Sequence, residues 1–181
     1  MKRVATILLL LILAGNTCLH AHEPDNPQGF IPNKGQWHPQ VRYKMSLPQG
    51  AMFLEPAGFS YTLYDASIWA SKHEYSETGK EAPSQIRSHT LRMRLEGANE
   101  VSSTREESPS LTRYNFFIGN DSRKWASGLH SYQSVTYPEV YPGTDLKLYI
   151  QEKQFKYDFI LQPGADIAAI RMHYDGAEQI S

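Results

Sequence analysis

Cysteine is nearly absent from this chain, in which Cys18 is the only one among 181 residues. A single cysteine excludes an intramolecular disulfide framework, so the folded domain must depend on its apolar core. Lipid attachment at Cys18 is also disfavoured. A lipoprotein signal has a small residue directly before the cysteine and an aliphatic one three positions before it, where this chain has Thr17 and Gly15.

An excess of positive charge is missing too. The chain has 18 basic and 19 acidic residues. Removing an N-terminal leader that carries Lys2 and Arg3 would leave 16 basic against 19 acidic residues, a net charge of −3. Because no basic stripe remains to neutralise phosphates, we expect no nucleic-acid partner.

The apolar run VATILLLLILAG, at residues 4–15, is too short to cross a bilayer, for which a helix needs about 20 residues. It follows a basic start and precedes a polar stretch, as in a cleavable secretory signal. We expect a signal peptide for the Sec pathway at residues 1–21, cleaved after Ala21. Residues 22–181 would then form one exported domain without stable membrane insertion; a retained membrane anchor is the alternative.

A sustained 3.6-residue period is lacking outside the leader, whereas alternation of apolar and polar residues is frequent. Alternation with a period of two is the pattern of half-buried β-strands. We therefore expect an all-β, mostly antiparallel domain, built as a β-sandwich or an open barrel. The alternating segments are VRYKM (41–45), AMFLE (51–55), GFSYTLY (58–64), HTLRMRLEG (89–97), LKLYI (146–150) and FKYDFIL (155–161).

Polar stretches interrupt these segments. They predict surface loops at residues 71–88 and 98–110 and an irregular connection at residues 120–133. DIAAI, at residues 166–170, predicts one helical turn, and RMHYDG predicts a last strand. The chain stops at GAEQIS, where a further strand would begin, so we expect the domain to be truncated at its C-terminus.

Two Pro-Gly-x-Asp sequences, YPGTD and QPGAD, place Pro and Gly where a type II turn requires them. LKLYI and FKYDFIL lie between these turns and can pair as a hairpin, with a cross-strand ion pair between Lys147 and Asp158. Asp145, Asp158 and Asp166 could instead be catalytic carboxylates. A glycosidase, however, needs two carboxyls held across a cleft, and turn spacing does not supply them. The hairpin is the preferred interpretation.

Local motifs for catalysis or metal binding are missing. Apart from His20 and His22 at the leader boundary, no two histidines have the spacing that aims both rings at one metal. Ser127 lacks the flanking glycines of a nucleophile elbow, and Asn120 and Asp121 are not followed by the alternating ligands of a calcium loop. We assign no catalytic residue, no metal site and no cofactor.

Three tryptophans, Trp37, Trp69 and Trp125, are weak candidates for ligand binding, since all fall in or beside expected loops. Exposed aromatic rings on a β-sandwich can stack on sugar rings. The alternative, which we favour, is that each ring closes the end of a sheet and buries a large apolar area.

Longer stretches together resemble a known family. FIPNKGQWHPQVRY (30–43) is similar to the start of an uncharacterised domain, a domain of unknown function, at the N-terminus of large secreted bacterial proteins. Residues 114–150 and 155–177 resemble its second half. In such proteins β-propeller-type repeats or PKD modules follow, then a gliding-motility-type sorting signal for type IX secretion. These are absent here, which favours a fragment, and the resemblance implies no catalytic residue.

These observations lead us to expect a structural or adhesive module of a secreted or cell-surface protein. Its partners would be downstream modules of the same polypeptide, an extracellular polysaccharide or a surface protein. A carbohydrate-binding module is the alternative, and it requires the three tryptophans to be exposed and coplanar. A hydrolase is less favoured, because it requires Asp145, Asp158 and His173 to converge in one pocket.

The leader gives a direct prediction: the mature protein begins near His22 and is exported. Its basic start, short apolar run and Ala21 are the features that signal peptidase needs. Mass spectrometry of the exported protein should find the new N-terminus, whereas an intact Met1 terminus in the membrane fraction would contradict cleavage.

Overall fold

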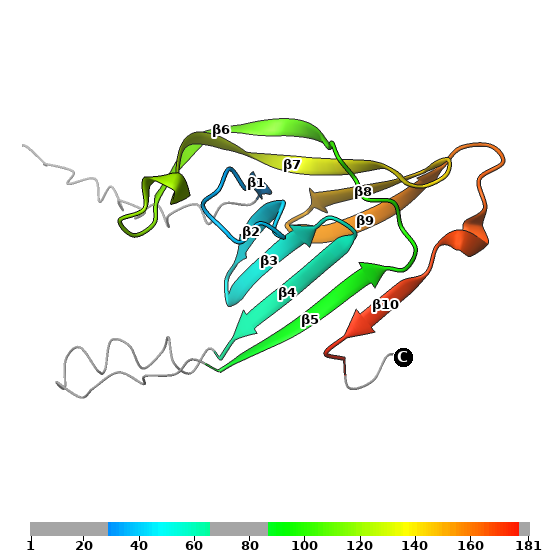
Figure 1. Ribbon diagram of the computed structural model, residues 1–181, viewed down its shortest axis with the longest axis horizontal. Coiled ribbons are helices and arrows are strands. Elements are labelled where there is room, and N and C mark those ends of the chain that lie inside the picture. The colour runs from blue at the N-terminus through cyan, green and yellow to red at the C-terminus, as the bar shows by residue number, and fades with distance from the viewer. Residues whose placement is uncertain (1–28, 66–86, 178–181) are drawn as a thin grey trace, which may run out of the picture.

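Two antiparallel sheets pack face to face in this protein, as Figure 1 shows. The computed structural model describes residues 29–65 and 87–177. The expected signal peptide, Trp69 and most of the expected loop at residues 71–88 lie outside the described residues. Neither sheet closes on itself, so the all-β expectation is confirmed in its sandwich form and not as a barrel.

The larger sheet has six strands in the order β1-β2-β3-β4-β5-β10. Strands β2 to β4 form the expected meander, while β10 arrives from the far end of the sequence and pairs with β5. This places the C-terminal strand at one edge of the sheet. The strands are β1 (Ile31–Pro32), β2 (Tyr43–Leu47), β3 (Gly50–Glu55), β4 (Gly58–Tyr64), β5 (Ser88–Leu95) and β10 (Met172–Asp175).

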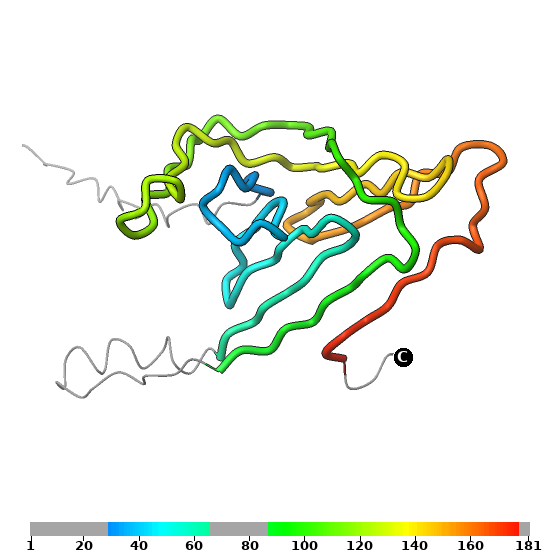
Figure 2. The backbone as a smooth tube through the Cα atoms, viewed as in Figure 1, coloured from blue at the N-terminus to red at the C-terminus, as the bar shows by residue number. Residues whose placement is uncertain are grey.

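The smaller sheet contains four consecutive strands, β6 (Arg105–Phe117), β7 (Trp125–Tyr141), β8 (Thr144–Gln151) and β9 (Gln154–Leu161). A short 3₁₀ helix, η1 (Ser122–Lys124), connects β6 to β7. A second, η2 (Ile167–Ala169), lies where the chain crosses from β9 to β10, as the tube in Figure 2 shows. The latter confirms the helical turn expected from DIAAI. Within the described part of the chain, no helical segment has the length and hydrophobicity of a membrane span.

The two longest strands replace segments that the sequence predicts as irregular. Strand β6 takes up half of the expected loop at residues 98–110, and β7 begins within the expected connection at residues 120–133. The expectation fails because most of β6 is exposed on both faces, so the strand has no apolar–polar alternation. Strand β6 is stabilised by backbone pairing with β7 and not by burial. This pairing is interrupted by irregularities near Pro109 and Tyr114.

The apolar core lies between the sheets. Its fully buried members include Met52, Leu54 and Met93 from one sheet and Leu146 and Leu148 from the other. Burying side chains of this size stabilises the fold by about 1.5–3 kcal/mol each.

The inward faces expected from alternation are mostly confirmed, with Tyr43, Met45, Phe59 and Leu95 buried. Leu63 is the exception, at 48% exposed, because the smaller sheet does not cover the far end of β4.

Both Pro-Gly turns form as predicted. Gly143 and Gly164 have φ of 69° and 90°, and the Ala165 amide donates to the Gln162 carbonyl at 3.0 Å. Strands β8 and β9 pair with Lys147 opposite Asp158, which confirms the hairpin and its register. The two-residue turn between them has positive φ at both residues, as in a type I′ turn.

The core gives a prediction for stability. Leu146→Ala should lower the free energy of unfolding by about 2–5 kcal/mol, because it leaves a cavity at a fully buried position. Leu111→Ala is the matched control: Leu111 is 100% exposed, and its replacement should change stability by less than about 0.5 kcal/mol. Urea unfolding measures both, and equal effects would contradict this assignment of the core.

Candidate functional site

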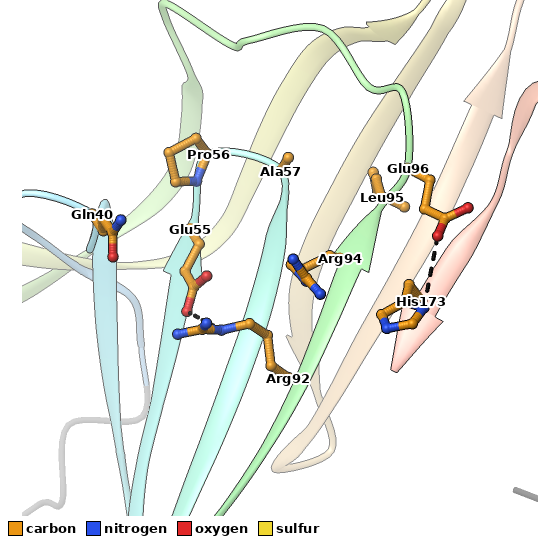
Figure 3. Close-up of a pocket in the computed structure, with 9 residues that line it drawn as sticks. All are labelled: Gln40, Glu55, Pro56, Ala57, Arg92, Arg94, Leu95, Glu96 and His173. Carbon is orange, nitrogen blue, oxygen red and sulfur yellow. Dashed lines mark hydrogen bonds and ion pairs between the residues drawn. The ribbon is translucent and has the colours of Figure 1, made fainter. Parts of the chain in front are cut away.

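A charged hollow of about 510 Å³ lies on the outer face of the six-stranded sheet (Figure 3). Arg92 and Arg94 point outward there because their β5 neighbours Met93 and Leu95 point into the core. Glu55 enters from the end of β3, and His173 enters from β10, opposite Arg94 in the sheet register. The lining residues are Gln40, Glu55, Pro56, Ala57, Arg92, Arg94, Leu95, Glu96 and His173.

The charges at this hollow are already paired with one another. Arg92 Nε lies 3.2 Å from Glu55 Oε1, and Arg94 Nη2 lies 2.7 Å from Asp175 Oδ2. Because these pairs are solvent-exposed, they contribute little to stability. Each arginine of the hollow therefore has a carboxylate partner.

His173 lies between two carboxylates at the edge of the hollow. Its Nε2 is 3.0 Å from Asp175 Oδ1, and its Nδ1 is 3.7 Å from Glu96 Oε1. Partial desolvation raises the pKa of Asp175, but the hydrogen bond from His173 and the charge of Arg94 outweigh it and hold that pKa below its usual range.

The residues that line the hollow include no serine, threonine or cysteine that His173 could activate. Among the residues that the structure describes, no group of three or more His, Cys, Asp and Glu side chains is placed to hold a metal ion. The hollow offers both hydrogen-bond donors and hydrogen-bond acceptors, which suit a polar ligand.

The three groups proposed for a hydrolase do not converge. Asp145 and Asp158 lie on the outer face of the smaller sheet, because their neighbours Leu146 and Tyr157 point inward. His173 lies on the outer face of the larger sheet, on the opposite side of the sandwich. These residues therefore do not form a common site.

The two aspartates that follow the Pro-Gly turns accept hydrogen bonds from nearby backbone amides. Asp145 Oδ1 accepts a hydrogen bond from the Glu139 amide at 2.8 Å, and its Oδ2 contacts Arg105 at 2.5 Å. Asp166 Oδ1 accepts from the Ala168 amide at 2.9 Å and caps η2.

The predicted ion pair between Lys147 and Asp158 is wrong, although the two residues are directly opposite. Lys147 Nζ instead reaches across β7 to Glu107 Oε2, at 2.9 Å. It can do so because β7 presents only the small side chains of Ser134 and Thr136 between them. The hydrogen bond from Lys147 is the main cause of a pKa of Glu107 below its usual range.

The two described tryptophans lie in different surroundings. Trp37 is half-buried, with its ring 5.1 Å from the ring of Phe116 and Lys44 Nζ 5.5 Å from its centre. Trp125 is 45% exposed, packs edge-on against Phe117 at 5.6 Å, and donates from Nε1 to the Gly119 carbonyl.

Trp37 and Trp125 do not share a plane. Phe116 and Phe117 are consecutive in a strand, so they project to opposite faces of the β6–β7 hairpin and hold the two tryptophans apart. The coplanar platform expected of a carbohydrate-binding module is therefore not formed by these two rings, and Trp69 lies outside the described residues.

An exposed apolar patch that the sequence reasoning missed surrounds Trp125. Phe117 is 66% exposed and Ile118 is 42% exposed. We call Phe117, Ile118 and Trp125 the arm tip, because they lie where the long β6–β7 hairpin ends (Figure 1). Phe117 and Ile118 belong to the apolar segment YNFFIG (114–119), and only the structure shows that this segment ends at the exposed tip of a hairpin.

The family assignment follows from comparison with known proteins. Residues 30–181 match the model of a domain of unknown function, DUF7948. The chain belongs to the DUF7948 family. No curated protein and no solved structure matches it. The resemblance to an uncharacterised domain is thereby confirmed, and the β-sandwich describes how this DUF7948 domain folds.

The contact between Lys147 and Glu107 gives a pH-dependent prediction. The folded-state pKa of Glu107 is below its ordinary value of 4.5, so its contribution to stability is present above that value and is lost as the pH falls through the folded pKa. Glu107→Gln should therefore destabilise the protein at pH 7, and the difference should vanish in acid. Glu152→Gln, in the β8–β9 turn, is the control and should show no such difference. Urea unfolding measured across pH tests both variants, and equal behaviour would contradict the pairing of Lys147 with Glu107.

Proposed function

We propose that this DUF7948 domain is a non-catalytic adhesive module of an exported protein, and that the arm tip is its binding surface. The observation that carries the proposal is the exposure of Phe117, Ile118 and Trp125 side by side on one hairpin. Scattered apolar residues are ordinary on protein surfaces, but a cluster that contains two aromatic rings is typical of a recognition surface.

The arm tip is held in a fixed arrangement before any ligand binds. The indole nitrogen of Trp125 is hydrogen-bonded to Gly119, and its ring is braced by Phe117. Aromatic side chains anchored in this way lose little conformational entropy on binding, which is why they dominate interface energies. The basic residues Arg123 and Lys124 lie next to this surface in η1.

The signal peptide expected at residues 1–21 supports a site of action outside the cytoplasm. In this proposal the domain stands at the head of a secreted or cell-surface protein, and its partner is an extracellular polysaccharide or a surface protein. A carbohydrate-binding role remains the second candidate, favoured by the exposed indole of Trp125, which can stack on a sugar ring.

The test is the binding of the labelled full chain to bacterial cells. Trp125→Ala should weaken binding by about tenfold or more, the effect of losing an anchor worth at least ~1.4 kcal/mol. Leu111→Ala is the matched control, because it removes a fully exposed leucine from the same hairpin and should leave binding unchanged.

Pretreatment of the cells distinguishes the two classes of partner. Loss of binding after periodate oxidation indicates a polysaccharide, and loss after protease digestion indicates a surface protein. Binding that is equal for Trp125→Ala and Leu111→Ala would contradict the role of the arm tip.

A further inference from the structure

Strand β9 forms an open edge of the smaller sheet, since it pairs with β8 and with no other described strand. Two hollows adjoin this edge, of about 790 Å³ and 450 Å³, and Tyr157 and Asp158 line both of them. The hollow toward η2 and β10 includes Leu161 and Met172, while the other reaches Tyr61 on the inner face of β4. No described strand pairs with this edge, although Tyr157 Oη lies 3.5 Å from Tyr174 Oη and 3.7 Å from Met172 Sδ of β10.

The two faces of β9 differ in chemistry. Phe155, Tyr157 and Phe159 point toward the larger sheet, where the Phe155 ring lies 5.0 Å from the ring of Phe59. Lys156 and Asp158 lie on the outer face, one residue on each side of Tyr157. An open edge of this kind is a template for another strand, and natural proteins commonly block it with charge. Here the two charges are of opposite sign.

Pairing of β9 with itself has few possible registers. Opposed residues in an antiparallel pair lie on the same face of the sheet, so inner residues must meet inner residues. A two-fold axis that relates two copies of β9 must therefore pass midway between two copies of the same residue. Centring it on Tyr157 places Lys156 opposite the partner subunit's Asp158, and the same contact occurs twice.

The neighbouring registers are disfavoured by charge. Centring the axis on Lys156 places Lys156 opposite the partner's Lys156, and centring it on Asp158 places two aspartates together. Like charges directly opposite each other destabilise a sheet, whereas opposite charges stabilise it. The sequence Lys-Tyr-Asp thus selects one register.

We propose that the β9 edge is a homodimer interface, in which two copies pair antiparallel about an axis between their Tyr157 residues and join their smaller sheets into one. On the inner face, Phe155 lies beside the partner's Phe159. The partner's aromatic side chains occupy the hollows on both sides of Tyr157. The occupant is a second copy because the edge is complementary in charge to itself.

The test is the oligomeric state of the full chain over a concentration series, measured by analytical ultracentrifugation. Asp158→Lys and Lys156→Asp each convert two attractive contacts into two repulsive ones and should weaken dimerisation by about tenfold or more. The double variant that exchanges the two charges should restore it. Lys153→Asp, in the turn beside β9, is the matched control and should have no effect.

Disulfide trapping tests the register independently. In a Cys18→Ser background, Tyr157→Cys should form an oxidised dimer, because the axis places the two positions directly opposite each other within disulfide reach. Lys156→Cys alone should not. Circular dichroism checks that each variant folds. A monomer at every concentration, or a dimer that tolerates both single charge reversals, would overturn the proposal.

Discussion

The contact between the inner faces of the two sheets is the interaction on which the rest of the structure depends. The domain contains no disulfide among its described residues, so the aromatic and aliphatic side chains between the sheets supply the stability. Phe59 is central to this contact, since its ring packs against those of Tyr61, Phe155 and Tyr157. Aromatic pairs of this geometry add about 0.5–1.5 kcal/mol each beyond the area that they bury.

The two sheets do not cover each other fully, and the candidate surfaces are found where the cover ends. At one end the β6–β7 hairpin extends with its arm tip exposed. Beside β9, the inner face of the larger sheet is open to the hollow that Tyr61 and Tyr157 line. Apolar groups at both places are exposed because the opposing sheet does not extend over them. The same residue types are buried where the two sheets face each other.

The charged residues, by contrast, mostly neutralise one another. Arg92 pairs with Glu55, Arg94 with Asp175, and Lys147 with Glu107. The hollow in Figure 3 is therefore polar without a dominant charge.

The sequence by itself determined the fold class, the meander of β2 to β4 and the β8–β9 hairpin with its register. Alternation and Pro-Gly turns are local signals, and they act within a few residues. Tertiary structure decided the length of β6 and β7, because β6 is stabilised by its neighbour and not by burial. It also decided that Lys147 reaches Glu107. The positions of Phe116 and Phe117 separate the two described tryptophans, and the two sheets place Asp145 and His173 on opposite faces of the sandwich. Each of these depends on which strands become neighbours, and alternation within a single strand contains no information about its partner.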